Sequence, residues 1–187
     1  MERICITDIT IRQAGKAAGY ELSFRDKIEL AKLLDRAGVD VIELHGLLSP
    51  RADSLLIKSI ASAVASSAVC VPIDPDPAQA AAVWQALREA KRPRLQVCAP
   101  VSTVQMEYLA GKKPEALLAA VEQTVQAAAA LCPEVEFAAW DATRAEPAFL
   151  ARAIDCAVRA GAGIVTLCDT AGVLLPDEMS AFVKATV

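Results

Sequence analysis

Polar and ionisable side chains follow five of the short apolar segments in this sequence, each close to the point where the segment ends. The candidates are Arg12 and Gln13, Glu43 and His45, Ser102, Asp141 and Arg144, and Thr170. An arginine in such a position can stabilise negative charge that develops on an oxygen atom during a reaction. That electrostatic role often contributes more to a rate than any other. The sequence therefore places side chains that could line a ligand or catalytic site after five of the apolar segments.

The apolar segments recur along the whole chain and are expected to be strands of a parallel sheet. They cover residues 4–7, 39–44, 68–71, 95–98, 135–138 and 163–167. They are closer to apolar runs than to a strict alternation of apolar and polar residues, which is typical of strands that helices cover on both faces. Proteins of this α/β class bind their ligands at the carboxyl ends of the strands. We therefore expect the polar residues that follow the strands to line the site.

Alanine- and leucine-rich stretches with helical spacing lie between the predicted strands. In the first, Ser23 can cap the helix, Asp26 can complete a capping box, and Gly38 can end the helix in a left-handed conformation. Residues 114–131 form the longest predicted helix, and residues 152–160 repeat the pattern of the first. Strand-then-helix units of about 30 residues therefore tile the sequence six times.

This organisation predicts an α/β fold but leaves two architectures open. One is a doubly wound open sheet, and the other is part of a (β/α)8 barrel, which typically needs about 250 residues. The sequence shows no linker, no low-complexity segment and no change of composition along its length. Residues 1–187 are therefore expected to form a single domain.

Composition excludes several classes of protein. The chain has 187 residues, of which 55% are hydrophobic and 22% charged, and its mean hydropathy is +0.36, which favours a large buried core over disorder. No apolar run reaches the ~18 residues of a membrane span, and no signal peptide is recognised at the start. The net charge of −4 argues against a nucleic-acid surface. We expect a cytoplasmic protein with neither nucleic acid nor membrane as partner.

Taken in order, the segments after the strands resemble the homocitrate synthase, 2-isopropylmalate synthase and HMG-CoA lyase superfamily of metal-dependent barrels. The family motif D-x-T-(I/L)-R resembles residues 8–12, G-V-D-x-I-E resembles 38–43, E-D-A-(T/S)-R resembles 140–144, and D-T-x-G-x-x-x-P resembles 169–176. The Pro-Val-Ser segment at 100–102, followed by Gly-Lys-Lys-Pro at 111–114, is most similar to homocitrate synthases of the nitrogen-fixation type. The resemblance implies an incomplete (β/α)8 TIM barrel of about six βα units.

The resemblance also implies an activity, a Claisen-type condensation of acetyl-CoA with a 2-oxo acid similar to 2-oxoglutarate. A divalent metal, Mg²⁺ or Mn²⁺, would be the cofactor. Arg12 matches the family's catalytic arginine, and Glu43, a polar pocket residue, is assigned to catalysis with it. Thr170 matches a hydroxyl near the carboxylate of the oxo acid. The other expected substrate-binding residues are Gln13, His45, Ser102, Asp141 and Arg144.

Three departures from the family pattern concern the metal and the pocket. Gln13 stands where the family has a metal-binding Asp or Glu, and a neutral amide is a poor ligand for a hard divalent cation. The family's His-x-His pair has no counterpart, since His45 is the only histidine. Trp140 replaces a glutamate, so its ring fills volume where a carboxylate would stand. The resemblance therefore implies that the metal ligands are not intact in this chain.

Several alternatives stay open. The sequence could be a fragment of a longer protein, or a subunit whose remainder comes from a partner chain, and a homo-oligomer or a complementing subunit is expected. It could also be a non-catalytic assembly or regulatory subunit, or a lyase or aldolase on the same scaffold. Asp141 and Arg144 could form only a turn-closing ion pair, and Asp169 and Thr170 could act only as caps. Lys112 and Lys113 could lie in solvent or attract the phosphates of CoA.

Overall fold

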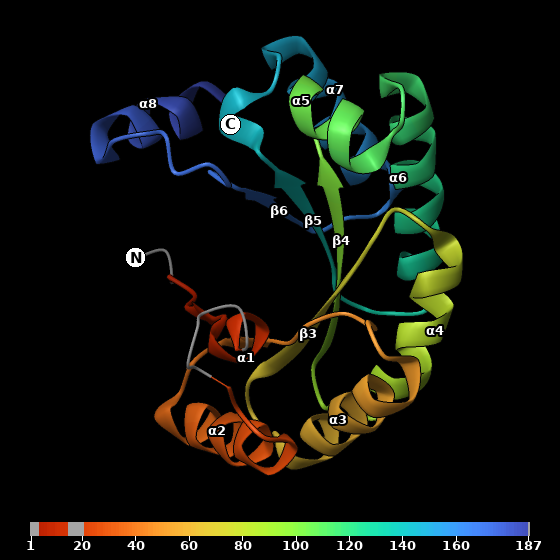
Figure 1. The fold of residues 1–187 in the computed structure, drawn as a ribbon, viewed down its shortest axis with the longest axis vertical. Helices are drawn as coiled ribbons and strands as arrows, with labels where there is room; N and C mark the ends of the chain where they lie inside the picture. The colour runs from red at the N-terminus through yellow and green to blue at the C-terminus, as the bar shows by residue number, and fades with distance from the viewer. Residues whose placement is uncertain (1–3, 15–20, 187) are drawn as a thin grey trace. The chain divides into compact units, whose positions relative to one another are not determined.

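The computed structural model describes residues 4–14 and 21–186 (Figure 1). Its contacts divide the chain into two compact units. Unit 1 comprises residues 1–73, 78–96 and 131–134, and unit 2 comprises residues 74–77, 97–130 and 135–187. None of the helices in the described ranges is both long and apolar enough to cross a membrane.

The strands β1 (Thr7–Asp8), β2 (Val41–Glu43), β3 (Ala68–Ile73), β4 (Pro93–Pro100), β5 (Val135–Trp140) and β6 (Ile164–Leu167) pair in the order of the sequence. The pairs β1–β2, β2–β3 and β5–β6 are parallel, and β4 belongs to unit 1 in its first half and to unit 2 in its second. A doubly wound sheet reverses its strand order at a switch point, whereas a barrel keeps each strand beside the next. The sequential order confirms the prediction of a (β/α)8-type fold, with six βα units in this chain.

In unit 1 the helices α1 (Thr10–Gln13), α2 (Phe24–Ala37), α3 (Pro50–Ala63) and α4 (Pro77–Leu87) accompany β1 to β3. Helices α2 and α3 pack side by side (Figure 1). The core between strands and helices includes Val41, Ala68 and Cys70, which are all buried. Burying apolar side chains from consecutive βα units in this way is the main source of stability for the unit.

Helix α2 confirms the predicted capping box. Ser23 Oγ accepts a hydrogen bond from the backbone N–H of Asp26, and the carboxylate of Asp26 accepts one from the N–H of Ser23. The helix ends at Gly38, whose φ of +83° lies in the left-handed region that glycine adopts without strain. The sequence signals at both ends of this helix therefore correspond to real contacts.

The first strand is shorter than the apolar segment 4–7 predicts. Only Thr7 and Asp8 pair with β2. The carbonyl of Ile6 accepts hydrogen bonds from the N–H groups of Asp40 and Val41, and its own N–H donates to the side chain of Asp40. The backbone of Ile6 is thus bonded to Asp40, which precedes β2, and to Val41, the first residue of β2, and the strand pairing begins at Thr7.

A carboxylate in α2 holds the loop between α3 and β3. The side chain of Asp35 accepts hydrogen bonds from the backbone N–H groups of Ala65, Ser66 and Ser67 at 2.9, 3.0 and 2.7 Å. Burial alone would raise the pKa of Asp35, but these donors hold its pKa below the ordinary value. The charged form of Asp35 is therefore the one that stabilises the loop.

Replacing Asp35 with alanine is expected to lower the free energy of unfolding by about 1–2 kcal/mol, because three backbone donors of a partly exposed loop lose a charged acceptor. Urea unfolding followed by circular dichroism measures this change. Asp155→Ala is the control, since Asp155 is 59% exposed and pairs with Arg159 on the surface of one helix, where such pairs contribute little. Equal effects of the two substitutions would contradict the role given to Asp35.

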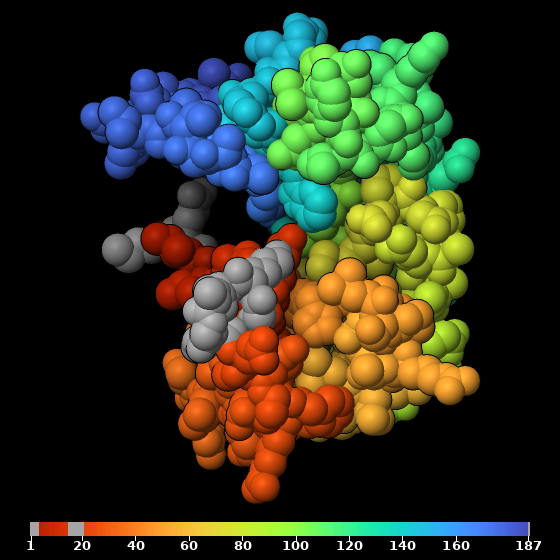
Figure 2. Space-filling model, in the orientation of Figure 1, coloured from red at the N-terminus to blue at the C-terminus, as the bar shows by residue number. Residues whose placement is uncertain are grey.

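Unit 2 contains α5 (Thr103–Gln105), the π-helical turn η1 (Met106–Ala110), α6 (Pro114–Ala129), the 3-10 turn η2 (Ala142–Arg144), α7 (Pro147–Ala160) and α8 (Pro176–Thr186). Helices α6 and α7 pack against each other and against β5, and Phe137 is fully buried between these elements. In the space-filling view the green segment of α5 and η1 forms part of the surface (Figure 2). Tyr108 and Leu109 in η1 are 78% and 72% exposed.

Two helix boundaries in unit 2 differ from those predicted. Helix α6 is the longest, as expected, but ends at Ala129 and leaves Leu131 in the following turn. Helix α7 begins at Pro147 instead of Arg152, because Glu146 caps it by accepting a hydrogen bond of 2.8 Å from the N–H of Phe149. Glutamate is an uncommon cap, which explains why the sequence did not suggest this start.

Candidate active site

Unit 1 brings two predicted catalytic residues into direct contact. Arg12 lies in α1, immediately after β1, and Glu43 is the last residue of β2. A nitrogen of the Arg12 guanidinium, Nη1, donates a hydrogen bond to Oε1 of Glu43, and Nε2 of Gln96 donates to Oε2 of Glu43 at 3.2 Å. The side chain of Glu43 is 5% exposed and that of Arg12 is 21% exposed. The pair therefore holds one guanidinium at the strand ends of unit 1.

The spacing Asp8-x-Thr10-x-Arg12 has a structural reason. The two carboxylate oxygens of Asp8 accept hydrogen bonds from the backbone N–H and from the hydroxyl of Thr10, at 2.9 and 3.1 Å. This closes the first turn of α1, and Ile11 in the same turn is fully buried. Arg12, the next residue, is thereby placed against Glu43. The motif is thus a hydrogen-bonded turn that positions Arg12.

The other two residues predicted in this unit lie differently. Nδ1 of His45 lies 3.0 Å from the carbonyl oxygen of Gly46 and 3.8 Å from a carboxylate oxygen of Asp53, and its side chain is half-buried. Gln13 is exposed at the end of α1. The structure thus joins Arg12 with Glu43 and places His45 beside Asp53.

In unit 2, Asp141 forms hydrogen bonds with three other predicted substrate-binding residues, Ser102, Arg144 and Thr170. The carboxylate of Asp141, whose side chain is fully buried, accepts hydrogen bonds from the hydroxyl of Ser102 and from Arg144, at 2.8 Å from Nε and 2.7 Å from Nη2. The backbone N–H of Asp141 donates to Thr170 Oγ1 at 2.8 Å. The bonds from Arg144 are the main reason that the pKa of Asp141 lies below its ordinary value. The ends of β4 and β5 and the loop after β6 are thereby joined.

Asp169 lies beside this network and binds the loop that precedes α8. Its carboxylate accepts a hydrogen bond of 2.7 Å from the hydroxyl of Thr143 and bonds of 3.2 and 3.1 Å from the N–H groups of Val173 and Leu174. The bond from Thr143 contributes most to lowering the pKa of Asp169. The charged carboxylate therefore orders the loop between β6 and α8.

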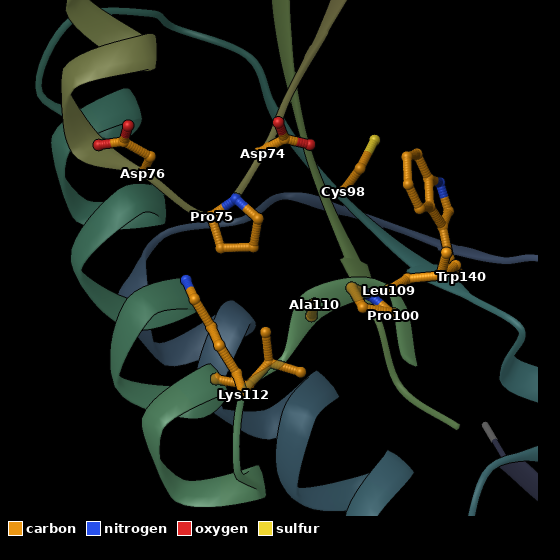
Figure 3. A pocket seen from close by; sticks show the side chains of 10 residues that line it. Asp74, Pro75, Asp76, Cys98, Pro100, Leu109, Ala110, Lys112 and Trp140 are labelled. Carbon is orange, nitrogen blue, oxygen red and sulfur yellow. The ribbon is translucent and has the colours of Figure 1, made fainter. Parts of the chain in front are cut away.

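Unit 2 also contains a pocket of about 310 Å³. Its apolar wall consists of Pro75, Pro100, Leu109, Leu117 and Trp140, with the thiol of Cys98 beside them. Asp74, Asp76 and Lys112 supply the charged groups (Figure 3). Trp140, the last residue of β5, lines the pocket, which agrees with the expectation that its ring occupies pocket volume. Ser102, Asp141, Arg144 and Thr170 are not among the lining residues.

Sequence reasoning missed several polar residues of both units. Gln96 could have been noticed, because it is the single polar residue within the predicted strand 95–98, and it is 3% exposed. Asp74 and Asp76 directly follow β3, which is the position that marked the other candidates. Their role in a pocket could not be derived from sequence, since the opposite wall comes from η1 and the end of β5.

Comparison with known proteins identifies the family of this chain. The sequence pattern that defines the HMGL-like family matches residues 3–187. The chain belongs to this family. It is 34% identical over 179 residues to a 2-isopropylmalate synthase of Halalkalibacterium halodurans, and the match covers 96% of the chain and 35% of the relative. It is also 34% identical over 177 residues to a 2-isopropylmalate synthase of Caulobacter vibrioides, covering 95% of the chain and 34% of the relative. The chain thus spans about a third of the length of the curated relatives it matches.

Solved structures agree with the barrel-type fold of this HMGL-like chain. The HMG-CoA lyase of Brucella melitensis superimposes with a TM-score of 0.75 at 19% identity, over 100% of the chain and 68% of the lyase. The HMG-CoA lyase of Bacillus subtilis gives a TM-score of 0.73 at 16% identity, over 88% of the chain and 57% of the lyase. At these identities the likeness concerns the fold alone.

Enzymes of the HMGL-like family generally depend on a divalent metal, and the residues of this chain do not fit one. Both carboxylate oxygens of Asp8 are engaged by Thr10, and the next polar residue after Arg12 is the amide Gln13. Within residues 4–14 and 21–186 no three His, Cys, Asp or Glu side chains are grouped so that they could hold a metal ion. A hard cation needs several oxygen ligands, preferably charged. The described residues therefore form no site suited to such a cation.

Proposed function

We propose that this chain belongs to an acyltransferase that condenses acetyl-CoA with a 2-oxo acid, with residues 1–187 acting as one HMGL-like domain. The observation that carries the proposal is the contact of the partly exposed Arg12 with the buried Glu43 at the strand ends of unit 1. The names of the relatives support the same kind of reaction. The segment at 111–114 favours the homocitrate form, in which the acceptor is 2-oxoglutarate.

The reaction needs two proton transfers, the formation of one carbon–carbon bond and one hydrolysis. A base removes a proton from the acetyl methyl group, and the resulting enolate carbon attacks the ketone carbon of the acceptor. The electron pair of the carbonyl bond moves to its oxygen, which then takes up a proton, and water cleaves the thioester to release CoA. Arg12 can stabilise the oxyanion by charge and hydrogen bonding. Glu43 acts through Arg12 by fixing the orientation of its guanidinium.

The remaining predicted site residues are proposed to take part in substrate binding. In unit 2, Arg144 is 43% exposed although it is bonded to Asp141, so part of its guanidinium stays open to an anionic ligand. Ser102 and Thr170 fix the position of Asp141 and through it of Arg144. In unit 1, the exposed amide of Gln13 and the half-buried ring of His45 are the further candidates.

The proposal is tested by incubating the purified chain with acetyl-CoA, a series of 2-oxo acids and Mg²⁺ or Mn²⁺ while free thiol is measured. We expect CoA release that requires an acceptor and saturates with its concentration. Thiol release at the same rate without any acceptor would indicate simple hydrolysis. That result, or no release with any acceptor, would contradict the proposed activity.

A second candidate function is a non-catalytic subunit of an assembly, either a homo-oligomer or a complex with a complementing chain. The observation that favours it is the engaged carboxylate of Asp8 followed by the amide of Gln13, which leaves the expected metal position without a charged ligand. Calorimetric titration with Mn²⁺ distinguishes the two candidates. Tight binding by the isolated chain would count against the subunit, and acceptor-dependent CoA release would exclude it.

A further inference from the structure

Gln96 is a buried glutamine that contacts the Arg12–Glu43 pair of unit 1. It lies in the part of β4 that belongs to this unit and is 3% exposed, and its amide nitrogen Nε2 donates a hydrogen bond of 3.2 Å to Oε2 of Glu43. The other carboxylate oxygen of Glu43, Oε1, accepts the bond from Nη1 of Arg12. One carboxylate therefore joins a neutral donor on one side to a guanidinium on the other.

Strand β3 lies between the two strands that carry this contact. The strand order places β3 between β2 and β4, and Glu43 pairs with Cys70 of β3. Gln96 thus reaches across a strand, which requires its side chain and that of Glu43 to lie on the same face of the sheet. Layers of side chains from alternate strands are typical of (β/α)8 barrels, where branched apolar residues dominate them. The bond to Glu43 accounts for an amide in such a layer, because buried polar groups need a partner.

The two bonds to Glu43 restrict different motions of the same group. The last torsion angle of a glutamate side chain is broad, so a carboxylate bonded through one oxygen can still turn about its final carbon–carbon bond. A bond at the second oxygen opposes this turn and keeps Oε1 directed at Arg12. Water does not readily replace the amide of Gln96, because the side chain of Glu43 is 5% exposed. Gln96 therefore limits the freedom of the carboxylate that holds Arg12.

We propose that Gln96 is a positioning residue for the condensation, which fixes the carboxylate of Glu43 and through it the guanidinium of Arg12. The inference rests on the proposed function, because it takes Arg12 to be the group that stabilises the developing oxyanion. Gln96 acts through Glu43 and does not itself need to touch the substrate. A displacement of a reacting group by about 1 Å can cost up to ~10²-fold in rate. The contribution of Gln96 is therefore large enough to measure.

The first test removes the donor and keeps the length of the side chain. Gln96→Met is expected to lower kcat for acceptor-dependent CoA release about tenfold and to change KM less than about twofold, because the position of Arg12 matters most when charge develops. Gln85→Met is the matched control, since Gln85 is exposed in α4 of the same unit, and it should leave both constants unchanged. An unchanged kcat in Gln96→Met would overturn the proposal.

The second test separates positioning from packing. If Gln96 acts through Arg12, adding Gln96→Met to Arg12→Ala should not lower kcat any further, because groups that act as a unit are not additive. Leu95→Ala is the packing control, since Leu95 is fully buried next to Gln96 in β4. It is expected to lower the unfolding midpoint without changing kcat of the folded protein. A full, independent loss from Gln96→Met in the Arg12→Ala background would refute the action through Arg12.

The third test observes Arg12 directly and does not depend on turnover. The guanidinium ¹⁵N–¹H signals of Arg12, identified by their absence in Arg12→Ala, report how fast the group rotates about its Nε–Cζ bond. We expect this rotation to be about threefold faster or more in Gln96→Met, because a hydrogen bond that restrains the partner carboxylate is lost. Gln85→Met should leave the rotation unchanged. The same rotation rate in Gln96→Met and the wild type would refute the positioning role.

The rotation rate and the turnover together distinguish a failure of this inference from a failure of the proposed function. Faster rotation in Gln96→Met, in a chain whose wild type shows no turnover, would support the positioning of Arg12 and contradict the proposed function. Turnover by the wild type that Gln96→Met does not lower would contradict the inference and support the proposed function.

Discussion

Replacing Arg12 with alanine is expected to lower kcat/KM for acceptor-dependent CoA release by about 10²–10³-fold, the usual effect of removing one donor to an oxyanion. Arg12 lies against Glu43 at the strand ends of unit 1. The loss should appear mainly in kcat, because the charge on the oxygen develops only during the reaction. Initial rates over a range of acceptor concentrations measure it.

Two further variants separate this effect from a loss of folding. Arg12→Ala leaves Glu43, which is 5% exposed, without its cationic partner, so the unfolding midpoint must be measured alongside the rate. Arg12→Ala combined with Glu43→Gln removes the unpaired charge and should regain stability without regaining activity. Arg152→Ala, which breaks an exposed pair with Glu115, is the matched control and should leave the rate unchanged. Activity near that of the wild type in Arg12→Ala would contradict the role of Arg12.

The largest loss of stability is expected for Asp141→Ala, about 3 kcal/mol in the free energy of unfolding. Its fully buried carboxylate accepts hydrogen bonds from the hydroxyl of Ser102 and from Nε and Nη2 of Arg144. Removing the carboxylate leaves these donors without their acceptor. The partial exposure of Arg144 keeps the estimate below that of a fully buried pair. Chemical denaturation followed by circular dichroism provides the measurement.

Asp141→Asn removes the charge of this side chain and keeps a residue that tolerates its backbone conformation. Asp141 has a φ of 60°, in the left-handed region, which asparagine tolerates better than most residues. Because the pKa of Asp141 is lowered in the folded protein, its contribution is complete above the unfolded value near ~4 and is lost as pH falls through the lower folded value. We therefore expect the free energy of unfolding to fall less in Asp141→Asn than in the wild type as the pH drops below about 4. An unchanged acid profile would contradict this assignment.

The parts of the fold that depend on residues close together in the sequence could be predicted from it. The capping box of Ser23 and Asp26 and the left-handed Gly38 involve residues a few positions apart, so spacing alone indicates them. The Asp141–Arg144 pair belongs to the same class, since one short turn brings the two side chains together. By contrast, the first strand begins later than the apolar segment 4–7 predicts, because the backbone of Ile6 bonds to Asp40 and Val41 and the strand pairing starts at Thr7.

The parts that depend on distant contacts could not be predicted in this way. The strand order distinguishes a barrel from a doubly wound sheet, and periodicity is the same in both. Gln96 reaches Glu43 across 53 positions of sequence, and no local pattern connects these two residues. The pocket of unit 2 likewise joins Asp74, Lys112 and Trp140 from three segments.

The formation of a carbon–carbon bond tests the proposed activity most directly. Acetyl-CoA labelled with ¹³C in its methyl group is incubated with the chain and 2-oxoglutarate, and the products are followed by ¹³C NMR. We predict that the methyl signal is replaced by a methylene signal whose carbon is bonded to a tertiary alcohol carbon, and that Arg12→Ala suppresses this signal. Labelled acetate as the only product, or intact acetyl-CoA, would show that the chain does not carry out the condensation.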